Sequence, residues 1–277
     1  MGSKSKFWHN HPKDEEGYWL FKYPRGNTGE HWAEKISAEV ANLIGIPHAR
    51  VELAVFQNMK GSSTKSFVTV GQELVHGNQL LSWYVSDYDP DKEYYQSSHT
   101  LSNIWSVLDQ LFTNYKSKKM AKIRLAEYIV LDALIGNTDR HHENWGILRQ
   151  RVDNKWKGLV APTFDHASSM GRELRDGRRE TLLSQNRVGE YVSRGRGAIY
   201  WSVDDRHGLS PLELVRRAYS KYPDLLLPAL RKVEKLNRES VETILNRVPK
   251  NWISNPARAF AIELMHFNIK QLLELSR

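Results

Sequence analysis

Residues 136–148 decide the fold and read Gly-Asn-Thr-Asp-Arg-His-His-Glu-Asn-Trp-Gly-Ile-Leu. The stretch follows the apolar segment 119–135, which we expect to form a buried helix that the glycine ends. It leads into two short β-type segments, 145–148 and 157–160, on either side of an Asp-Asn turn signal. A polar loop between a buried helix and a hairpin is held by a rigid scaffold, and such loops often carry functional side chains.

Three polar residues of this region have the spacing that phosphoryl transfer from ATP requires. Asp139 and Asn144 form an Asp-x-x-x-x-Asn pair, and Asp165 follows the second β-type segment. In this reaction one carboxylate orients or deprotonates the acceptor hydroxyl, while a carboxylate and an amide oxygen hold Mg²⁺ against the phosphates. The pattern predicts a catalytic base and two metal ligands. The alternative is that these residues only cap the loop and a turn.

The first 75 residues or so predict a β-rich unit with a single helix. Segment 18–23 is aromatic and short, which is typical of a strand, and 29–44 has apolar residues at helical spacing. Segments 51–56 and 65–70 are predicted strands on either side of the loop 61–63, whose two serine hydroxyls we expect to be exposed.

The remainder is predicted to be mainly helical. A helix is expected over 101–112, and three or four more from Ser210 onward, the last over 257–275. We therefore predict an α+β chain with a small β-rich N-lobe, residues 1–76, and a larger helical C-lobe, residues 77–277. Two lobes of this kind place a cleft between them.

Composition excludes several chemistries. The 277 residues include no cysteine, so disulfides, a thiolate nucleophile and Cys-ligated zinc are excluded. The net charge of +8 indicates attraction of anions such as nucleotides, phosphates or lipid headgroups. No uncharged apolar stretch reaches the ~20 residues that a membrane span needs, and the N-terminus does not read as a signal peptide. We expect a cytoplasmic protein.

The segments Asn-Thr-Asp-Arg-His-His-Glu-Asn (137–144) and Phe-Asp-His-Ala-Ser (164–168) resemble the HipA-like kinases. In that family the loop reads Asn-x-Asp-x-His-x-x-Asn, with a later Asp-x-x-Ser. The same stretch also resembles the phosphatidylinositol 3-/4-kinases, whose loop reads Asp-Arg-His-x-x-Asn with a later Asp. Both families have a protein-kinase-like fold, so the resemblance, which runs from residue 1 to about 170, implies a bilobal kinase-like architecture.

The resemblance assigns roles around the loop. It implies that Asp139 is the catalytic base, that Asn144 and Asp165 bind magnesium, and that His141 is the loop histidine, which orients its neighbours through hydrogen bonds. For His142 we expect an exposed histidine without a role. A zinc site is not expected, because the histidine spacing does not fit a His-Glu-x-x-His helix.

In the N-lobe, Lys22 lies in the first convincing strand and matches the lysine that reaches the ATP phosphates in kinases. A glutamate of the following helix would clamp it. Glu34 matches the HipA-like pattern better, and Glu39 remains open. A solvent-facing lysine and solvated glutamates are the alternative.

Two further ATP contacts are expected on positional grounds. Segment 72–77 occupies the place of the hinge, where the backbone groups of Glu73 and Val75 would pair with adenine; the alternative is an ordinary strand exit. The N-terminal residues 2–6 resemble the glycine-containing phosphate loop of HipA-like kinases, with Lys4 on the phosphates. The alternative there is a frayed terminus.

Residues 172–196 hold seven arginines and show no periodicity, so we expect a long mobile loop at the place of an activation segment. It could dock the acceptor, with Thr181, Ser184 or Ser193 as phosphorylation sites. It could instead read phosphoinositide headgroups at a membrane, or be a solvated surface loop.

Together these observations predict an ATP- and Mg²⁺-dependent phosphotransferase, a HipA-like serine/threonine kinase of toxin type. The resemblance implies a protein acceptor, with a tRNA-bound protein as one candidate, and an antitoxin or repressor partner on a separate chain. Two alternatives stay open: a lipid kinase of phosphatidylinositol type, and a pseudokinase-like module that binds nucleotide without transferring phosphate.

Overall fold

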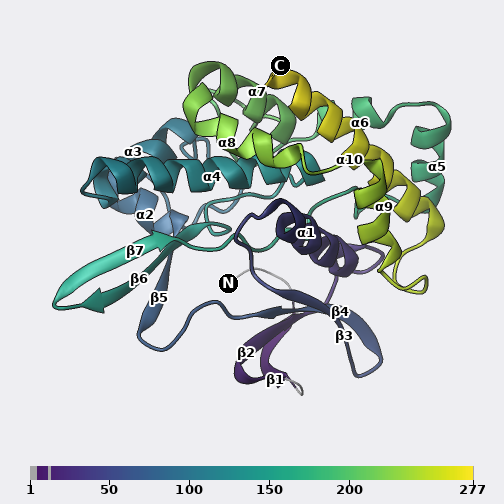
Figure 1. Ribbon diagram of the computed structural model, residues 1–277, viewed down its shortest axis with the longest axis horizontal. Coiled ribbons are helices and arrows are strands. Elements are labelled where there is room, and N and C mark those ends of the chain that lie inside the picture. Colours follow the sequence, from purple (N-terminus) through teal and green to yellow (C-terminus); the bar gives the residue numbers. More distant parts are fainter. Residues whose placement is uncertain (1–4, 12–13, 277) are drawn as a thin grey trace.

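The computed structural model describes residues 5–11 and 14–276, and Figure 1 labels its helices and strands. The strands are β1 (Lys6–His11), β2 (Asp14–Lys22), β3 (Val51–Phe56), β4 (Met59–Lys65), β5 (Gln72–His76), β6 (Gly146–Val152) and β7 (Lys155–Val160). The helices are α1 (Glu30–Ile44), α2 (Gly77–Tyr84), α3 (Leu101–Leu111), α4 (Tyr115–Ile135), α5 (Asp176–Ser184), α6 (Val188–Arg194), α7 (Pro211–Lys221), α8 (Pro223–Val233), α9 (Arg238–Asn246) and α10 (Asn255–Leu275).

The N-terminal sheet is antiparallel, has the strand order β1-β2-β4-β3 and packs against α1. Trp19 and Phe21 of β2 are fully or almost fully buried. Gly45 ends α1 with a left-handed φ of 71°, a conformation that glycine adopts without steric cost. The predicted helix over 29–44 is therefore confirmed.

One predicted strand of this sheet is wrong. The chain turns at Gln57 and Asn58, both with positive φ, so the second strand of the hairpin is β4 and not 65–70. Ser62 and Ser63 consequently lie inside the strand and are buried, not exposed in a loop. Neither turn residue is Gly or Pro, so the sequence pattern placed the predicted turn further along the chain, at 61–63.

A second sheet, of order β5-β6-β7, joins the two parts of the molecule. β5 closes the segment predicted as N-lobe, yet it pairs with the β6–β7 hairpin of the C-terminal part and not with the N-terminal sheet. The hairpin projects at the edge of the molecule in Figure 1. Its turn lies at Asp153 and Asn154, with φ of 50° and 59°, as predicted.

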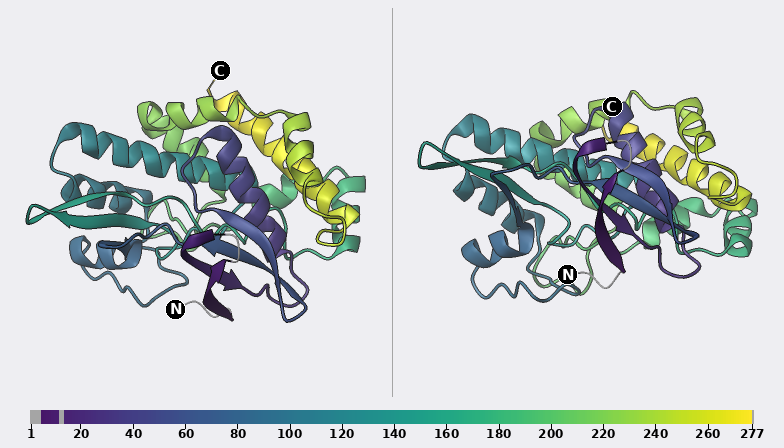
Figure 2. Two further views of the ribbon diagram at one scale, coloured as in Figure 1. Left: turned by 60° about the horizontal axis from the view of Figure 1, so that its bottom comes forward. Right: turned by 90° about the horizontal axis from the view of Figure 1, so that it is seen from below.

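Helix α4 is the centre of the helical lobe and packs against α7, α8 and α10. Its C-terminal half is buried on every side from Leu125 to Ile135, so the predicted buried helix is confirmed. Figure 2 shows α10, in yellow, running across the same lobe. Within the described residues no helix is both long and apolar enough to cross a membrane.

The prediction of a mobile loop over 172–196 is wrong, because most of this segment forms α5 and α6. Leu182, Val188 and Val192 are buried, and both helices pack against α10. The segment has too few apolar residues to show a helical period, so its structure depends on contacts with a helix far along the chain.

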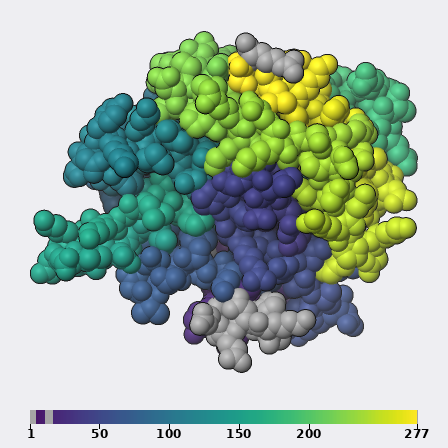
Figure 3. All heavy atoms as spheres, in the orientation of Figure 1, coloured from purple at the N-terminus to yellow at the C-terminus, as the bar shows by residue number. Residues whose placement is uncertain are grey.

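Helix α1 is held by both parts of the molecule. It packs against β3 and β4 on one side and against α9 on the other. Lys232 of α8 donates to the carbonyl of Gly45 at its C-terminal end over 2.7 Å. In Figure 3 the dark purple surface of α1 is accordingly bordered by residues of the helical lobe. Any side chain that α1 presents to the site is thus fixed relative to the N-terminal sheet and to the helical lobe.

Replacement of Gly61 tests the packing of the N-terminal sheet. A Cβ at this position would lie 2.4 Å from the ring of Phe21 and 2.6 Å from the carbonyl oxygen of Lys22. We expect Gly61→Ala to lower the free energy of unfolding by about 1–3 kcal/mol, because a well-packed site does not accept an added methyl group. Urea unfolding measures the change.

Gly26→Ala is the matched control, because no atom lies within 4 Å of a Cβ built there. Equal unfolding midpoints for the Gly61 and Gly26 variants would contradict this account of the sheet.

Candidate active site

The loop after α4 is anchored by a buried ion pair. Arg140 donates through Nε and Nη2 to the two carboxylate oxygens of Asp132 at 2.8 and 2.7 Å. Its Nη1 donates to the carbonyls of Asn144 at 2.6 Å and Phe164 at 3.2 Å. Burial alone would lower the pKa of Arg140, but the Asp132 carboxylate raises it, so the guanidinium stays charged. One side chain thus joins α4, the loop and the segment before Asp165.

This anchor was not predicted, although its signal was present. Asp132 is the only charged residue in the apolar run 129–135. A carboxylate buried in such a run needs a cation and hydrogen-bond donors. The donors are Arg140 and Asn137, whose Nδ2 lies 2.8 Å from Asp132.

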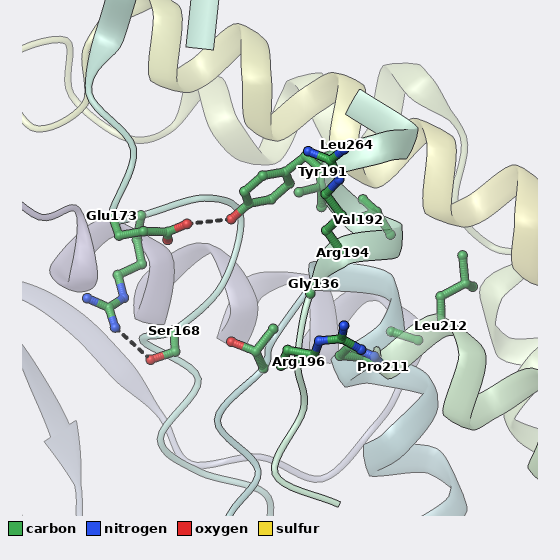
Figure 4. A pocket seen from close by; sticks show the side chains of 14 residues that line it. Gly136, Ser168, Glu173, Tyr191, Val192, Arg194, Arg196, Pro211, Leu212 and Leu264 are labelled. Carbon is green, nitrogen blue, oxygen red and sulfur yellow. Dashed lines mark hydrogen bonds between the residues drawn. The ribbon is translucent and has the colours of Figure 1, made fainter. Parts of the chain in front are cut away.

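Asp139 is held at the turn of the loop. Its backbone N–H donates to Oδ1 of Asn137 at 3.2 Å. Its carboxylate accepts a hydrogen bond from the Ser168 hydroxyl at 3.2 Å, and Arg172 donates to the same hydroxyl at 3.1 Å. Figure 4 shows the hydrogen bond between this arginine and Ser168 as a dashed line. Ser168 and Arg172 therefore orient one oxygen of the predicted base, a role that sequence reasoning missed.

Asn144 faces Asp139 across the same turn. Its Nδ2 donates to the carbonyl of Asp139 at 2.7 Å, which fixes the orientation of the amide. Asp165 adopts a left-handed φ of 57°, which is uncommon for a residue other than glycine and is found at functional sites. Mg²⁺ in nucleotide sites is held by one or two carboxylates together with phosphate oxygens, so these donors suit it.

Lys22 of β2 forms an ion pair with Asp165 at 3.0 Å and links the N-terminal sheet to the loop region. Burial alone would lower the pKa of Lys22, but Asp165 and then Glu34 raise it. Glu34 is 1% exposed, and its Oε1 lies 3.6 Å from Nδ1 of His166. Burial would raise the pKa of Glu34, whereas His166 and Lys22 lower it below its usual range.

The other candidate glutamate lies elsewhere. Glu39 pairs with Lys35 at 2.7 Å, one turn along α1 and away from Lys22. Of the two glutamates that the sequence left open, Glu34 is therefore the one whose charge acts on Lys22.

The two loop histidines have different surroundings. His141 accepts from the backbone N–H of Glu143 at 3.3 Å, and its Nε2 lies 3.8 Å from Glu93. His142 was expected to be exposed, but this is wrong, because it is 1% exposed and its Nδ1 lies 2.8 Å from the Tyr88 hydroxyl. The chain after α2 covers His142, which no local pattern indicates.

In β5 the backbone N–H and C=O groups of the two predicted hinge residues, Glu73 and Val75, point the opposite way from those of Leu74 between them. Gly77 N–H donates to the carbonyl of Trp145 at 2.9 Å, and bonded pairs alternate along an antiparallel ladder. The backbone groups of Glu73 and Val75 therefore face β6, while those of Leu74 face the open edge of the sheet. The Glu73 side chain pairs with Arg149.

Lys4 lies outside the described residues. Lys6, at the end of the predicted phosphate loop, begins β1 and lies directly opposite Lys22 in the register of β1 and β2.

Two cavities adjoin the loop, of about 340 and 270 Å³, and both are lined by Thr138 and Arg196. The first, shown in Figure 4, extends past Ser168 to Arg194. The second is lined by Asp139 and His141. The second cavity therefore opens onto Asp139, and the first reaches Ser168, the hydrogen-bond partner of Asp139.

Comparison with known proteins agrees with this architecture. In overall structure the chain is similar to a Helicobacter pylori proinflammatory kinase, CtkA, with a TM-score of 0.78, 19% identity, and coverage of 99% of this chain and 92% of that one. It is also similar to HipA in the Shewanella oneidensis toxin–antitoxin complex with HipB and operator DNA, with a TM-score of 0.64, 13% identity, and coverage of 100% and 63%. The α+β, bilobal, kinase-like fold predicted from the sequence is confirmed.

The family follows from the sequence comparison. Residues 1–252 match the family described as the HipA-like C-terminal domain, and the chain belongs to this family, as the motif resemblance predicted. The curated serine/threonine-protein kinase CtkA of Helicobacter pylori is 26% identical over 143 residues. That match covers 52% of this chain and 41% of the relative, less than half the relative's length.

Disruption of the Asp132–Arg140 pair tests the anchor. We expect Arg140→Ala to cost about 3–5 kcal/mol of unfolding free energy, because it leaves the Asp132 carboxylate buried without its cation. The double variant Asp132→Leu/Arg140→Met removes both charges and should recover part of that loss. Chemical denaturation of the three proteins gives the comparison. An Arg140→Ala protein as stable as the unaltered chain would show that the pair is not the anchor.

Proposed function

We propose that the chain is an ATP- and Mg²⁺-dependent serine/threonine protein kinase. The observation that carries the proposal is the Lys22–Asp165 ion pair, which brings the strand lysine to the predicted metal-binding carboxylate beside Asp139 and Asn144. In phosphoryl transfer, catalysis consists mostly of positioning the phosphates and stabilising their charge. The name of the serine/threonine kinase CtkA supports the same reaction.

The roles follow from the geometry. Lys22 would bind the ATP phosphates, with Glu34 near its ammonium group, and Asn144 and Asp165 would hold Mg²⁺, which neutralises phosphate charge. Asp139 would accept the proton of the acceptor hydroxyl. The hydroxyl oxygen bonds to the γ-phosphorus, the bond to the β–γ bridging oxygen breaks, and ADP leaves. Ser168, which donates to one oxygen of Asp139, would hold the carboxylate in place for this step.

The adenine contact is proposed for the open edge of β5. Because Glu73 and Val75 direct their backbone groups toward β6, the backbone of Leu74 is the better candidate for pairing with the base. The predicted role of Lys4 stays a prediction.

The acceptor is proposed to be a protein hydroxyl that enters beside Arg196, between the two cavities at the loop. Toxin activity and a separate antitoxin chain are proposals by analogy with HipA, whose complex contains HipB and operator DNA. Arg140 is the arginine of the Asp-Arg-His motif that resembles the phosphatidylinositol kinases, but it does not favour a lipid acceptor, because it is buried against Asp132 and cannot meet a headgroup.

Asp139→Asn tests the reaction. The amide keeps the shape of the carboxylate but cannot accept the proton, so we expect the rate of phosphate transfer to fall by about 10²- to 10⁴-fold. The assay uses labelled ATP, Mg²⁺, a cell lysate and phosphoinositide vesicles, and it follows label in protein and in lipid. EDTA should abolish the label.

Asp224→Asn, a change at an exposed residue of α8 that lines neither cavity, is the control variant. Label that depends on Asp139 but appears only in lipid would favour the lipid kinase. Label that persists in Asp139→Asn would contradict the assignment of the base.

A further inference from the structure

Glu30 is a buried carboxylate that the proposed reaction does not use. It begins α1, is 3% exposed and lies four residues before Glu34, so the two carboxylates are neighbours on one face of the helix. A carboxylate removed from water needs cations or hydrogen-bond donors. The backbone N–H of Arg25 donates to Oε2 of Glu30 at 2.8 Å, and the Arg25 guanidinium donates to Oε1 at 3.4 Å. A further contact of Glu30 leads out of the helix toward the catalytic loop.

This contact is with Arg172, in the segment before α5. Nη1 of Arg172 lies 3.2 Å from Oε1 of Glu30, and the arginine side chain is 15% exposed. The backbones meet at the same place, since the N–H of Gly29 donates to the Arg172 carbonyl at 2.8 Å. The neighbouring carboxylate of Glu173 accepts instead from the Tyr191 hydroxyl at 2.6 Å, as Figure 4 shows. Glu30 is therefore the carboxylate that holds the Arg172 side chain.

The direction of the hydrogen bonds carries this contact on to the base. A guanidinium has only donors, so the Ser168 hydroxyl must accept from Nη2 of Arg172 in their 3.1 Å contact. The one hydroxyl proton of Ser168 is then left for the carboxylate of Asp139, whose Oδ2 lies 3.2 Å away. Without Arg172 the hydroxyl is free to rotate and to donate elsewhere. An ordered chain of contacts thus runs from α1 through Arg172 and Ser168 to the base.

The same face of α1 also acts on the lysine of β2. Burial would lower the pKa of Lys22, and among the charged neighbours Asp165 opposes this most. Glu34 raises the pKa of Lys22 as well, and Glu30 does so more weakly. Two carboxylates about one helical turn apart therefore act on the two sides of the proposed transfer. Glu34 acts on the side that would bind the ATP phosphates, and Glu30 acts on the side of the base.

We propose that Glu30 is a positioning residue for phosphate transfer, which acts through Arg172 and Ser168 on the orientation of the base. Neither Glu30 nor Arg172 touches the reacting atoms in this role. Because Glu34 lies on the same helix, one placement of α1 sets both the base and the phosphate-binding lysine. The inference rests on the proposed kinase reaction and adds to it the part played by the first turn of α1.

The competing role for Arg172 is acceptor binding, because Arg172 also lines the cavity of about 340 Å³ that reaches Ser168. An arginine that binds the acceptor acts independently of the Ser168 hydroxyl, so the effects of losing the two side chains multiply. An arginine that positions the base acts through that hydroxyl, so the second loss adds nothing to the first. The two roles therefore differ in a double-mutant cycle.

The cycle measures transfer from labelled ATP to lysate protein, at saturating ATP and Mg²⁺. Ser168→Ala and Arg172→Ala should each slow transfer about tenfold, as expected when a charged group loses one hydrogen bond. The double variant should be no slower than either single variant. Calorimetry with Mg²⁺ and a non-hydrolysable ATP analogue should give Ser168→Ala the affinity of the unaltered chain. Arg175→Ala is the control for Arg172→Ala, because Arg175 is exposed in the same segment and does not line this cavity.

Glu30→Gln tests the start of the chain of contacts. The amide keeps the size of the carboxylate but is a weaker, neutral acceptor, so transfer should slow about threefold. In the Ser168→Ala background the same change should have no further effect. Glu39→Gln is the matched control, because Glu39 lies on the same helix and pairs with Lys35.

Rates that multiply in the double variant overturn the positioning role and assign Arg172 to acceptor binding. Transfer by Ser168→Ala at the unaltered rate overturns it as well, as do equal effects of Glu30→Gln and Glu39→Gln. Thermal unfolding shows whether each variant is folded. Ser168→Ala removes a single oxygen atom, so this variant keeps the test decisive if Arg172→Ala does not fold. If the unaltered chain labels no protein, the kinase proposal itself fails, which distinguishes the two failures.

Discussion

The buried ion pair between Asp132 and Arg140 is the interaction on which the site depends. A carboxylate at the end of an apolar helix is expensive to bury unless its oxygens receive several donors. Arg140 and Asn137 supply them, and in doing so they fix the loop that carries Asp139 and Asn144. The same guanidinium reaches the carbonyl before Asp165. The burial of one charge therefore sets the relative positions of three candidate site residues.

A second electrostatic group joins the two lobes. Lys22 comes from the N-terminal sheet, Asp165 from the segment after β7 and Glu34 from α1. Asp165 and Glu34 favour the charged form of Lys22, whereas the charged form of Glu34 is favoured by His166 and Lys22 and opposed by Asp165. Helix α1 is central to this arrangement, since its Glu34 acts on Lys22 and its first turn lines a cavity shared with α5 and α10. Contacts that hold the first turn of α1 therefore also affect the position of Glu34 relative to Lys22.

Much of the architecture could be predicted from local sequence. The helix before the loop, the turn at Asp153 and the helix over 29–44 follow from apolar spacing and glycine positions. Two predictions were wrong for the same reason, namely the strand over 65–70 and the mobile loop over 172–196. In both places the local signal is weak, and packing against distant segments decides the conformation. His142 shows the same limit for a single side chain, because its burial depends on the chain after α2.

By itself the sequence determined the family, the kinase-like fold and the polar residue types of the loop 137–144, because short motifs and apolar periodicity indicate them. Only the tertiary structure decided between Glu34 and Glu39, added Ser168 and Arg172 beside Asp139, and turned the backbone of Leu74 to the open edge of β5. It also brought the starts of α1, α5 and α10 together around one cavity. These features depend on contacts between residues far apart in the chain, whose geometry no local pattern contains.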